Sequence, residues 1–120
     1  MSKIAVVTGA SQGIGEAIAE RLNEDGWVVF NLDRSPPSNT DNPSTWIETD
    51  LADPAAIATA FEIVAAEGPV LGLVNNAGLG IMTELEETTV EDFDLTVDVN
   101  MKAPMPVSYT HLTLPTILLV

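Results

Sequence analysis

The 120-residue sequence contains no cysteine, one histidine and only four basic residues. Without cysteine the chain can form neither a disulfide nor a thiolate metal site, and a lone His111 is too little for a histidine metal site. Eighteen acidic residues give a net charge of -14, which repels nucleic-acid phosphates and anionic membranes. We therefore expect no metal, no nucleic acid and no membrane among the binding partners.

Long hydrophobic runs and targeting signals are also missing. No stretch approaches the roughly 20 apolar residues that a membrane-spanning helix needs, and no secretory signal pattern precedes the apolar run that starts at Ile4. The sequence has no Gly-Lys-Ser or Gly-Lys-Thr, which excludes a phosphate-loop nucleotide hydrolase. We expect a cytoplasmic protein of one domain or part of one.

The most informative segment that is present is a glycine-rich turn at residues 8–15, Thr-Gly-Ala-Ser-Gln-Gly-Ile-Gly. A short apolar run at residues 4–7 precedes this turn. A helical pattern follows it, with an apolar face made by Ile14, Ala17, Ile18 and Leu22. Strand, glycine turn and helix in this order aim backbone N–H groups at a pyrophosphate, so we favour nucleotide binding over a simple bend.

Apolar runs alternate with amphipathic segments along residues 1–106. Strands are expected at residues 4–7, 27–32, 46–49 and 70–74, and helices after the glycine turn, from Asp53-Pro54 and from Thr89. Residues 35–44, rich in proline, serine and asparagine, are expected to form a loop. The alternation predicts an α/β fold: a Rossmann-like doubly wound parallel sheet, truncated after the fourth strand and the following helix.

Polar residues gather where the expected strands end, which is where such sheets bind ligands. Asp33 ends the second strand, at the place where a carboxylate accepts hydrogen bonds from the adenosine ribose of NAD. This carboxylate repels a 2′-phosphate, although Arg34 can pair with one, so we favour NAD over NADP as the cofactor. The candidate cofactor-binding residues are Gly9, Ser11, Gln12, Gly13, Ile14, Gly15, Asp33, Arg34, Asp50, Leu51, Asn76, Ala77 and Gly78.

Two further strand ends and one helix supply the remaining candidates. Asp50 is a candidate partner for the exocyclic amine of adenine or, equally, a turn-capping residue. Residues 75–78, Asn-Asn-Ala-Gly, are small enough for backbone to approach a ribose, and their amides can tie neighbouring loops together. Asn100 is expected on the buried face of the third helix with Phe93 and Val97, where an amide needs partners. We expect Pro104 and Pro106 to disturb or end that helix.

Taken together, the chain resembles the N-terminal part of a short-chain dehydrogenase/reductase over about residues 3–105. The resemblance rests on residues 8–15, Asp33, Asp50-Leu51, residues 75–78 and Val99-Asn100. It implies NAD(P)-dependent oxidation of a secondary alcohol, or reduction of the matching ketone. It also implies that Asn100 is a catalytic residue that supports a proton-relay water, and that intact relatives are homo-oligomeric.

The Tyr-x-x-x-Lys pair implied by this resemblance is absent. The only tyrosine, Tyr109, is followed four positions later by Thr113, and no lysine follows Lys102. We therefore assign no catalytic role to Ser108 or Tyr109 and expect the 120-residue chain to be inactive on its own. A non-catalytic NAD(P)-binding regulatory module is the alternative, whereas the Asn-Asn-Ala-Gly turn argues against an S-adenosylmethionine-dependent methyltransferase.

Residues 107–120 break the helical pattern and resemble a translated sequencing adapter. Where the third helix should continue an amphipathic stripe, β-branched residues and Pro115 appear instead. We therefore expect residues 1–106 to form the N-terminal part of a dinucleotide-binding domain, and residues 107–120 to be a non-native tail.

Overall fold

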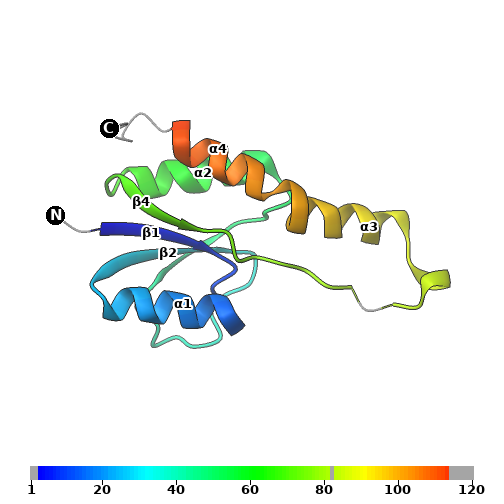
Figure 1. The fold of residues 1–120 in the computed structure, drawn as a ribbon, viewed down its shortest axis with the longest axis horizontal. Coiled ribbons are helices and arrows are strands. Elements are labelled where there is room, and N and C mark those ends of the chain that lie inside the picture. The colour runs from blue at the N-terminus through cyan, green and yellow to red at the C-terminus, as the bar shows by residue number, and fades with distance from the viewer. Residues whose placement is uncertain (1–2, 82, 114–120) are drawn as a thin grey trace.

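A four-stranded parallel sheet forms the centre of the molecule (Figure 1). The computed structural model describes residues 3–81 and 83–113. Its strands are β1 (Lys3–Thr8), β2 (Trp27–Asp33), β3 (Thr45–Glu48) and β4 (Val70–Val74), and they lie side by side in the order β3-β2-β1-β4. Consecutive parallel strands need crossover connections, and this order confirms the predicted Rossmann-like doubly wound sheet.

Helices cover both faces of the sheet. α1 (Gly13–Glu24) lies on one face, and α2 (Pro54–Ala65) and α4 (Pro104–Thr113) lie on the other (Figure 1). Side chains alternate between the two faces along a strand, so β1 contributes Ile4 and Val6 to the core under α2 and Val7 to the core over α1. Burial on both faces explains the near-continuous apolar run of β1.

The helix starts that the sequence predicts at Asp53 and Thr89 are confirmed. Asp53 Oδ1 accepts a hydrogen bond from the N–H of Ala55 at 3.0 Å, and Pro54 occupies the first helical position. Thr89 and Asp92 form a capping box at the start of α3 (Val90–Val97). Local side-chain chemistry therefore sets where these two helices begin.

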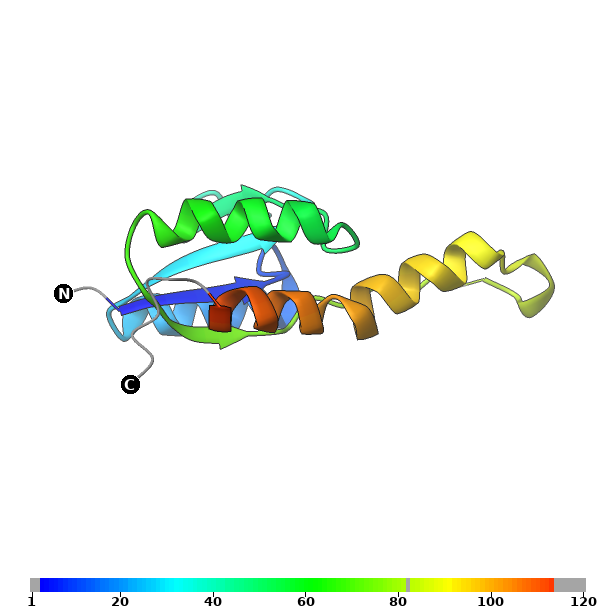
Figure 2. The same ribbon diagram turned by 90° about the horizontal axis from the view of Figure 1, so that it is seen from above.

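The predicted buried stripe on the third helix is wrong. α3 has no buried residue among those described, and Phe93 is 63% exposed. Figure 2 shows the reason, because α3 extends away from the sheet instead of lying across it. An apolar periodicity identifies one face of a helix, but it does not place another element of the chain against that face.

The disturbance of the third helix that the sequence predicts around Pro104 and Pro106 is confirmed. α3 passes into a π-helical segment, η2 (Asp98–Lys102), and α4 begins at Pro104. The first turn of a helix has N–H groups without intrahelical partners, so a proline there loses no hydrogen bond. The regular α-helix is thus interrupted ahead of Pro104, and helical structure resumes there as α4, which also contains Pro106.

The residue at which the predicted tail starts, Val107, lies within α4. Its side chain is 1% exposed and belongs to the core under α2, together with Ala103. Residues 108–113 of the predicted tail continue α4, and residues 114–120 lie outside the described residues. The boundary at residue 106 therefore stays a prediction.

The segment between β2 and β3 is the expected loop, since no helix interrupts it. It is fastened to the rest of the domain, because the N–H of Ser38 donates to the carbonyl of Ser11 at 2.8 Å and Asn23 Nδ2 donates to Ser44 Oγ at 3.0 Å. Within residues 3–81 and 83–113, no helix is both long and apolar enough to cross a membrane.

Candidate functional site

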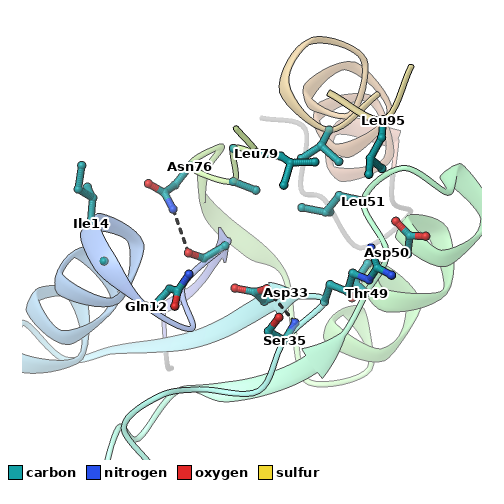
Figure 3. A pocket seen from close by; sticks show the side chains of 16 residues that line it. Gln12, Ile14, Asp33, Ser35, Thr49, Asp50, Leu51, Asn76, Leu79 and Leu95 are labelled. Carbon is teal, nitrogen blue, oxygen red and sulfur yellow. Dashed lines mark hydrogen bonds between the residues drawn. The ribbon is translucent and has the colours of Figure 1, made fainter. Parts of the chain in front are cut away.

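A pocket of about 470 Å³ opens at the carboxyl edge of the sheet. The predicted residues that line it are Gly9, Gln12, Gly13, Ile14, Asp33, Arg34, Asp50, Leu51, Asn76, Ala77 and Gly78. Figure 3 shows Leu51, Leu79 and Leu95 on one side of the pocket and Gln12, Asp33 and Ser35 on the other. Leucine side chains therefore form one side of the pocket, close to Asp50, and polar side chains form the opposite side.

Some predicted residues do not line the pocket, and some lining residues were not predicted. Ser11, Gly15 and Asn100 lie outside the lining, whereas Ser35, Thr49, Leu79, Leu95 and Val99 are part of it. Ser35 and Thr49 are direct neighbours of predicted residues, so a wider reading of each strand end would have included them. Leu79 likewise follows the predicted Gly78, whereas Leu95 carries no sequence signal, because apolar residues occur everywhere along this chain.

Three glycines shape the turn between β1 and α1. Gly9 has a φ of +70°, and a Cβ there would lie 2.8 Å from Ala77 Cα. A Cβ on Gly15 would overlap both Asn76 Nδ2 and the carbonyl of Gly9. These two glycines are therefore required for close packing against the loop after β4.

Gly13 differs from the other two glycines because it faces open space. Its φ is +64°, and a Cβ on it would meet nothing within 4 Å, although the residue lines the pocket. α1 begins at this residue, and the N-cap Gln12 makes no side-chain capping hydrogen bond. The N-terminus of α1 therefore presents an uncapped, positive helix end at the lining of the pocket.

Asn76 ties the loops after β1 and β4 together, as the sequence predicts for an amide in this turn. Its Nδ2 donates to the carbonyls of Thr8 and Gly9, at 3.1 and 3.0 Å. Thr8 Oγ1 in turn accepts from the N–H groups of Asn76 and Ala77, both at 3.1 Å. This network fixes the glycine turn against the loop after β4, and Figure 3 draws one of its hydrogen bonds, from Asn76 to the carbonyl of Gly9.

Asp33 lies half-buried in the pocket wall, with both carboxylate oxygens engaged by backbone. Oδ2 accepts from the N–H of Ser11 at 3.1 Å, and Oδ1 accepts from the N–H of Ser35 at 3.0 Å. A carboxylate oxygen can accept more than one hydrogen bond, so Asp33 retains capacity for the hydroxyls of a ligand. Arg34, the next residue, is exposed and lines the same pocket.

Asp50 makes a turn-capping contact, which is one of the two roles that the sequence analysis gives it. Its Oδ1 accepts from the N–H of Ala52 at 2.9 Å, while the residue remains exposed in the pocket lining. Leu51 beside it is 7% exposed and supplies an apolar wall. The pair offers an acceptor next to an apolar surface, which is the combination that a flat heteroaromatic ring needs.

Asn100 is exposed and lies in η2, so the expectation of a buried side chain is wrong. Its amide nevertheless has two backbone partners. Oδ1 accepts from the N–H of Leu79 at 2.6 Å, and Nδ2 donates to the carbonyl of Leu79 at 2.7 Å. The residue therefore holds the loop after β4 in place beside the pocket.

Comparisons with known proteins agree with this geometry. The family model for short chain dehydrogenases matches residues 3–117. The 3-oxoacyl-[acyl-carrier-protein] reductase MabA of Mycobacterium tuberculosis is 37% identical over 102 residues, which cover 84% of this chain and 40% of MabA.

Two solved structures extend the comparison to three dimensions. A short chain dehydrogenase from Burkholderia cenocepacia in complex with NADP has a TM-score of 0.80 and 35% identity, over 92% of this chain and 49% of the other. The 3-ketoacyl-(acyl-carrier-protein) reductase of Brucella melitensis, complexed with NADH, has a TM-score of 0.80 and 30% identity, over 89% of this chain and 48% of the other.

A parallel sheet with a glycine turn and a pocket at its carboxyl edge defines a Rossmann-like nucleotide-binding class of protein. The chain belongs to the short-chain dehydrogenase family. It spans only part of the length of its curated relatives, for example 40% of MabA.

Proposed function

We propose that this chain forms the dinucleotide-binding half of an NAD(P)-dependent oxidoreductase that interconverts a secondary alcohol and a ketone. The observation that carries the proposal is the uncapped N-terminus of α1, which meets open space at Gly13. Backbone N–H groups at a helix N-terminus bind phosphate without a cationic side chain. Such binding suits a chain whose net charge is -14.

Different groups of pocket-lining residues suit the different parts of a dinucleotide. The amides from Gln12 to Ile14 would hold the pyrophosphate, and the Asp33 carboxylate would accept from the adenosine ribose. Asp50 and Leu51 would receive the adenine, and the backbone of residues 76–78 would contact the second ribose. When bound, the nicotinamide ring would supply or accept the hydride.

Asn100 acts on this site through another residue. Its two hydrogen bonds to Leu79 fix the loop that lines the pocket. A support role for a proton-relay water, implied by the family resemblance, remains part of the proposal. Because the chain has no Tyr-x-x-x-Lys, its residues would bind and orient the cofactor without performing the proton transfer at the substrate.

The preference for NAD over NADP is likewise a proposal, since family members bind each form. The Burkholderia cenocepacia enzyme is in complex with NADP and the Brucella melitensis enzyme with NADH. In this chain, the half-buried Asp33 carboxylate would repel a 2′-phosphate at short range. Arg34 is exposed, so its charge is better screened by solvent than that of Asp33.

The binding proposal is tested by titrating NAD into the isotope-labelled chain and following backbone amide shifts. We expect weak binding, with shifts concentrated at residues 12–15, 33–35, 50–51 and 76–79. Gly13→Ala should abolish these shifts, because its methyl group would occupy the space proposed for the pyrophosphate. Failure of NAD to shift these amides in the unaltered chain would refute the proposal.

Gly26→Ala is the matched control. Gly26 also has a positive φ, +91°, and a Cβ on it would also meet nothing within 4 Å, but it follows the opposite end of α1. Both substitutions therefore carry a similar backbone strain of about 1–2 kcal/mol. Only Gly13→Ala should lose NAD binding, and equal losses in the two variants would show that strain alone is responsible.

A further inference from the structure

Three residues at the edge of the pocket form a closed ring of hydrogen bonds. Asp33 accepts from the N–H of Ser11 through Oδ2 and from the N–H of Ser35 through Oδ1. Ser11 Oγ closes the ring by donating to the carbonyl of Ser35 at 2.6 Å. The ring joins the glycine turn to the loop after β2 through one carboxylate.

The buried side-chain amide of Asn31 is hydrogen-bonded to this ring through Ser11. Asn31 is 1% exposed, its Oδ1 accepts from the N–H of Ala10 at 2.9 Å, and its Nδ2 donates to Ser11 Oγ at 2.9 Å. Since Nδ2 can only donate, the Ser11 hydroxyl hydrogen is left for the carbonyl of Ser35. With both amide atoms paired in the interior, Asn31 has a single favourable orientation.

We propose that Ser11 and Asn31 are positioning residues that set the discrimination between NAD and NADP by holding the Asp33 carboxylate in place. This inference rests on the proposed function. Asp33 cannot turn away from a 2′-phosphate without losing the N–H donors of both Ser11 and Ser35. A fixed negative charge discriminates more strongly than a movable one, because a movable one relaxes away from the repulsion.

The Ser11→Ala variant tests this proposal, with the dissociation constants of NAD and NADP measured by amide-shift titration. The substitution removes the hydroxyl that anchors Ser35, so Asp33 gains freedom to turn and Arg34 can pair with the 2′-phosphate. We expect the ratio of the NADP constant to the NAD constant to fall by roughly five- to tenfold. A merely structural role would weaken both dinucleotides equally and leave the ratio unchanged, which would overturn the inference.

Ser38→Ala is the matched control, because it removes a serine hydroxyl from the same loop but outside the ring. Ser38 Oγ donates to Glu16 Oε2 at 2.9 Å on the surface. The ratio in Ser38→Ala should equal that of the unaltered chain. An equal fall in both variants would assign the effect to the loop as a whole and would also overturn the inference.

A measurement on the unaltered chain decides the matter even if Ser11→Ala does not fold. The amides of Ser11 and Ser35 should stay equally protected from hydrogen exchange in saturating NAD and in saturating NADP, because the Asp33 carboxylate that accepts from both keeps its place beside the 2′-phosphate. Faster exchange of these two amides with NADP than with NAD would show that the carboxylate turns away, and would overturn the inference alone. Absence of binding by either one would overturn the proposed function as well.

Discussion

Asn100 and Leu79 exchange two hydrogen bonds in opposite directions, one through each polar atom of the asparagine side chain. The N–H of Leu79 donates to Oδ1 at 2.6 Å, and Nδ2 donates to the carbonyl of Leu79 at 2.7 Å. A side-chain amide thus pairs with one residue's backbone much as a neighbouring strand would. The π-helical segment η2 carries Asn100, and such segments often occur at functional sites.

Replacing Asn100 with alanine should loosen the loop after β4. Both hydrogen bonds to Leu79 are lost, and because the site is exposed, we expect a cost of about 1–2 kcal/mol in the free energy of unfolding. Hydrogen exchange at the Leu79 amide should accelerate. Asn39→Ala, which removes a surface amide that accepts from Asp41 at 3.0 Å, should leave the Leu79 amide unchanged. Unaltered exchange at Leu79 in the Asn100 variant would contradict this role.

The sequence predicts well whatever depends on neighbours along the chain. The starts of α2 and α3 follow from Asp53 and Thr89, whose capping contacts lie within three residues. The pocket lies where the strand ends predict it, because parallel strands bring their carboxyl ends to one edge. The parallel topology thus brings polar residues that are far apart in the sequence together in one pocket.

Contacts between distant segments could not be predicted in the same way. The burial expected for Phe93 and Asn100 fails because periodicity does not reveal what packs on a helix face. The ring through Ser35 was missed because one of its bonds ends on a backbone carbonyl, which any residue type supplies. Side-chain identity carries no information about such an acceptor.

Gly15→Ala should destabilise the domain, although alanine has a higher helix propensity than glycine. Alanine in place of glycine within a helix stabilises by about 1 kcal/mol. Here the new methyl group would overlap Asn76 Nδ2 and the carbonyl of Gly9, and forced overlap costs about 1–3 kcal/mol. Denaturant unfolding should therefore show a net loss, whereas Gly80→Ala, where a Cβ meets nothing within 4 Å, should change little. A stabilised Gly15 variant would mean that the two loops separate easily.

Thr8→Val should be costly although the two side chains have nearly the same shape. Thr8 is 2% exposed, and its Oγ1 accepts from the N–H groups of Asn76 and Ala77. Valine leaves both donors without this acceptor, so we expect a loss of about 2 kcal/mol or more in thermal or denaturant unfolding. Thr59→Val, at an exposed helix position where Oγ1 donates to the carbonyl of Ala55, should stay within about 0.5 kcal/mol. Equal effects would show that the Thr8 hydroxyl adds nothing beyond its volume.

Dinucleotide affinity should rise with ionic strength. The chain carries a net charge of -14 and the ligand is itself an anion, so their long-range interaction is repulsive and salt screens it. The N–H groups at the start of α1 act at contact distance, where screening is weaker. The salt dependence should be steeper for NADP than for NAD, because NADP carries the extra phosphate. Titrations at two potassium chloride concentrations, with sucrose as an uncharged control, measure this difference. A fall in affinity with added salt would instead indicate that cations such as Arg34 dominate binding.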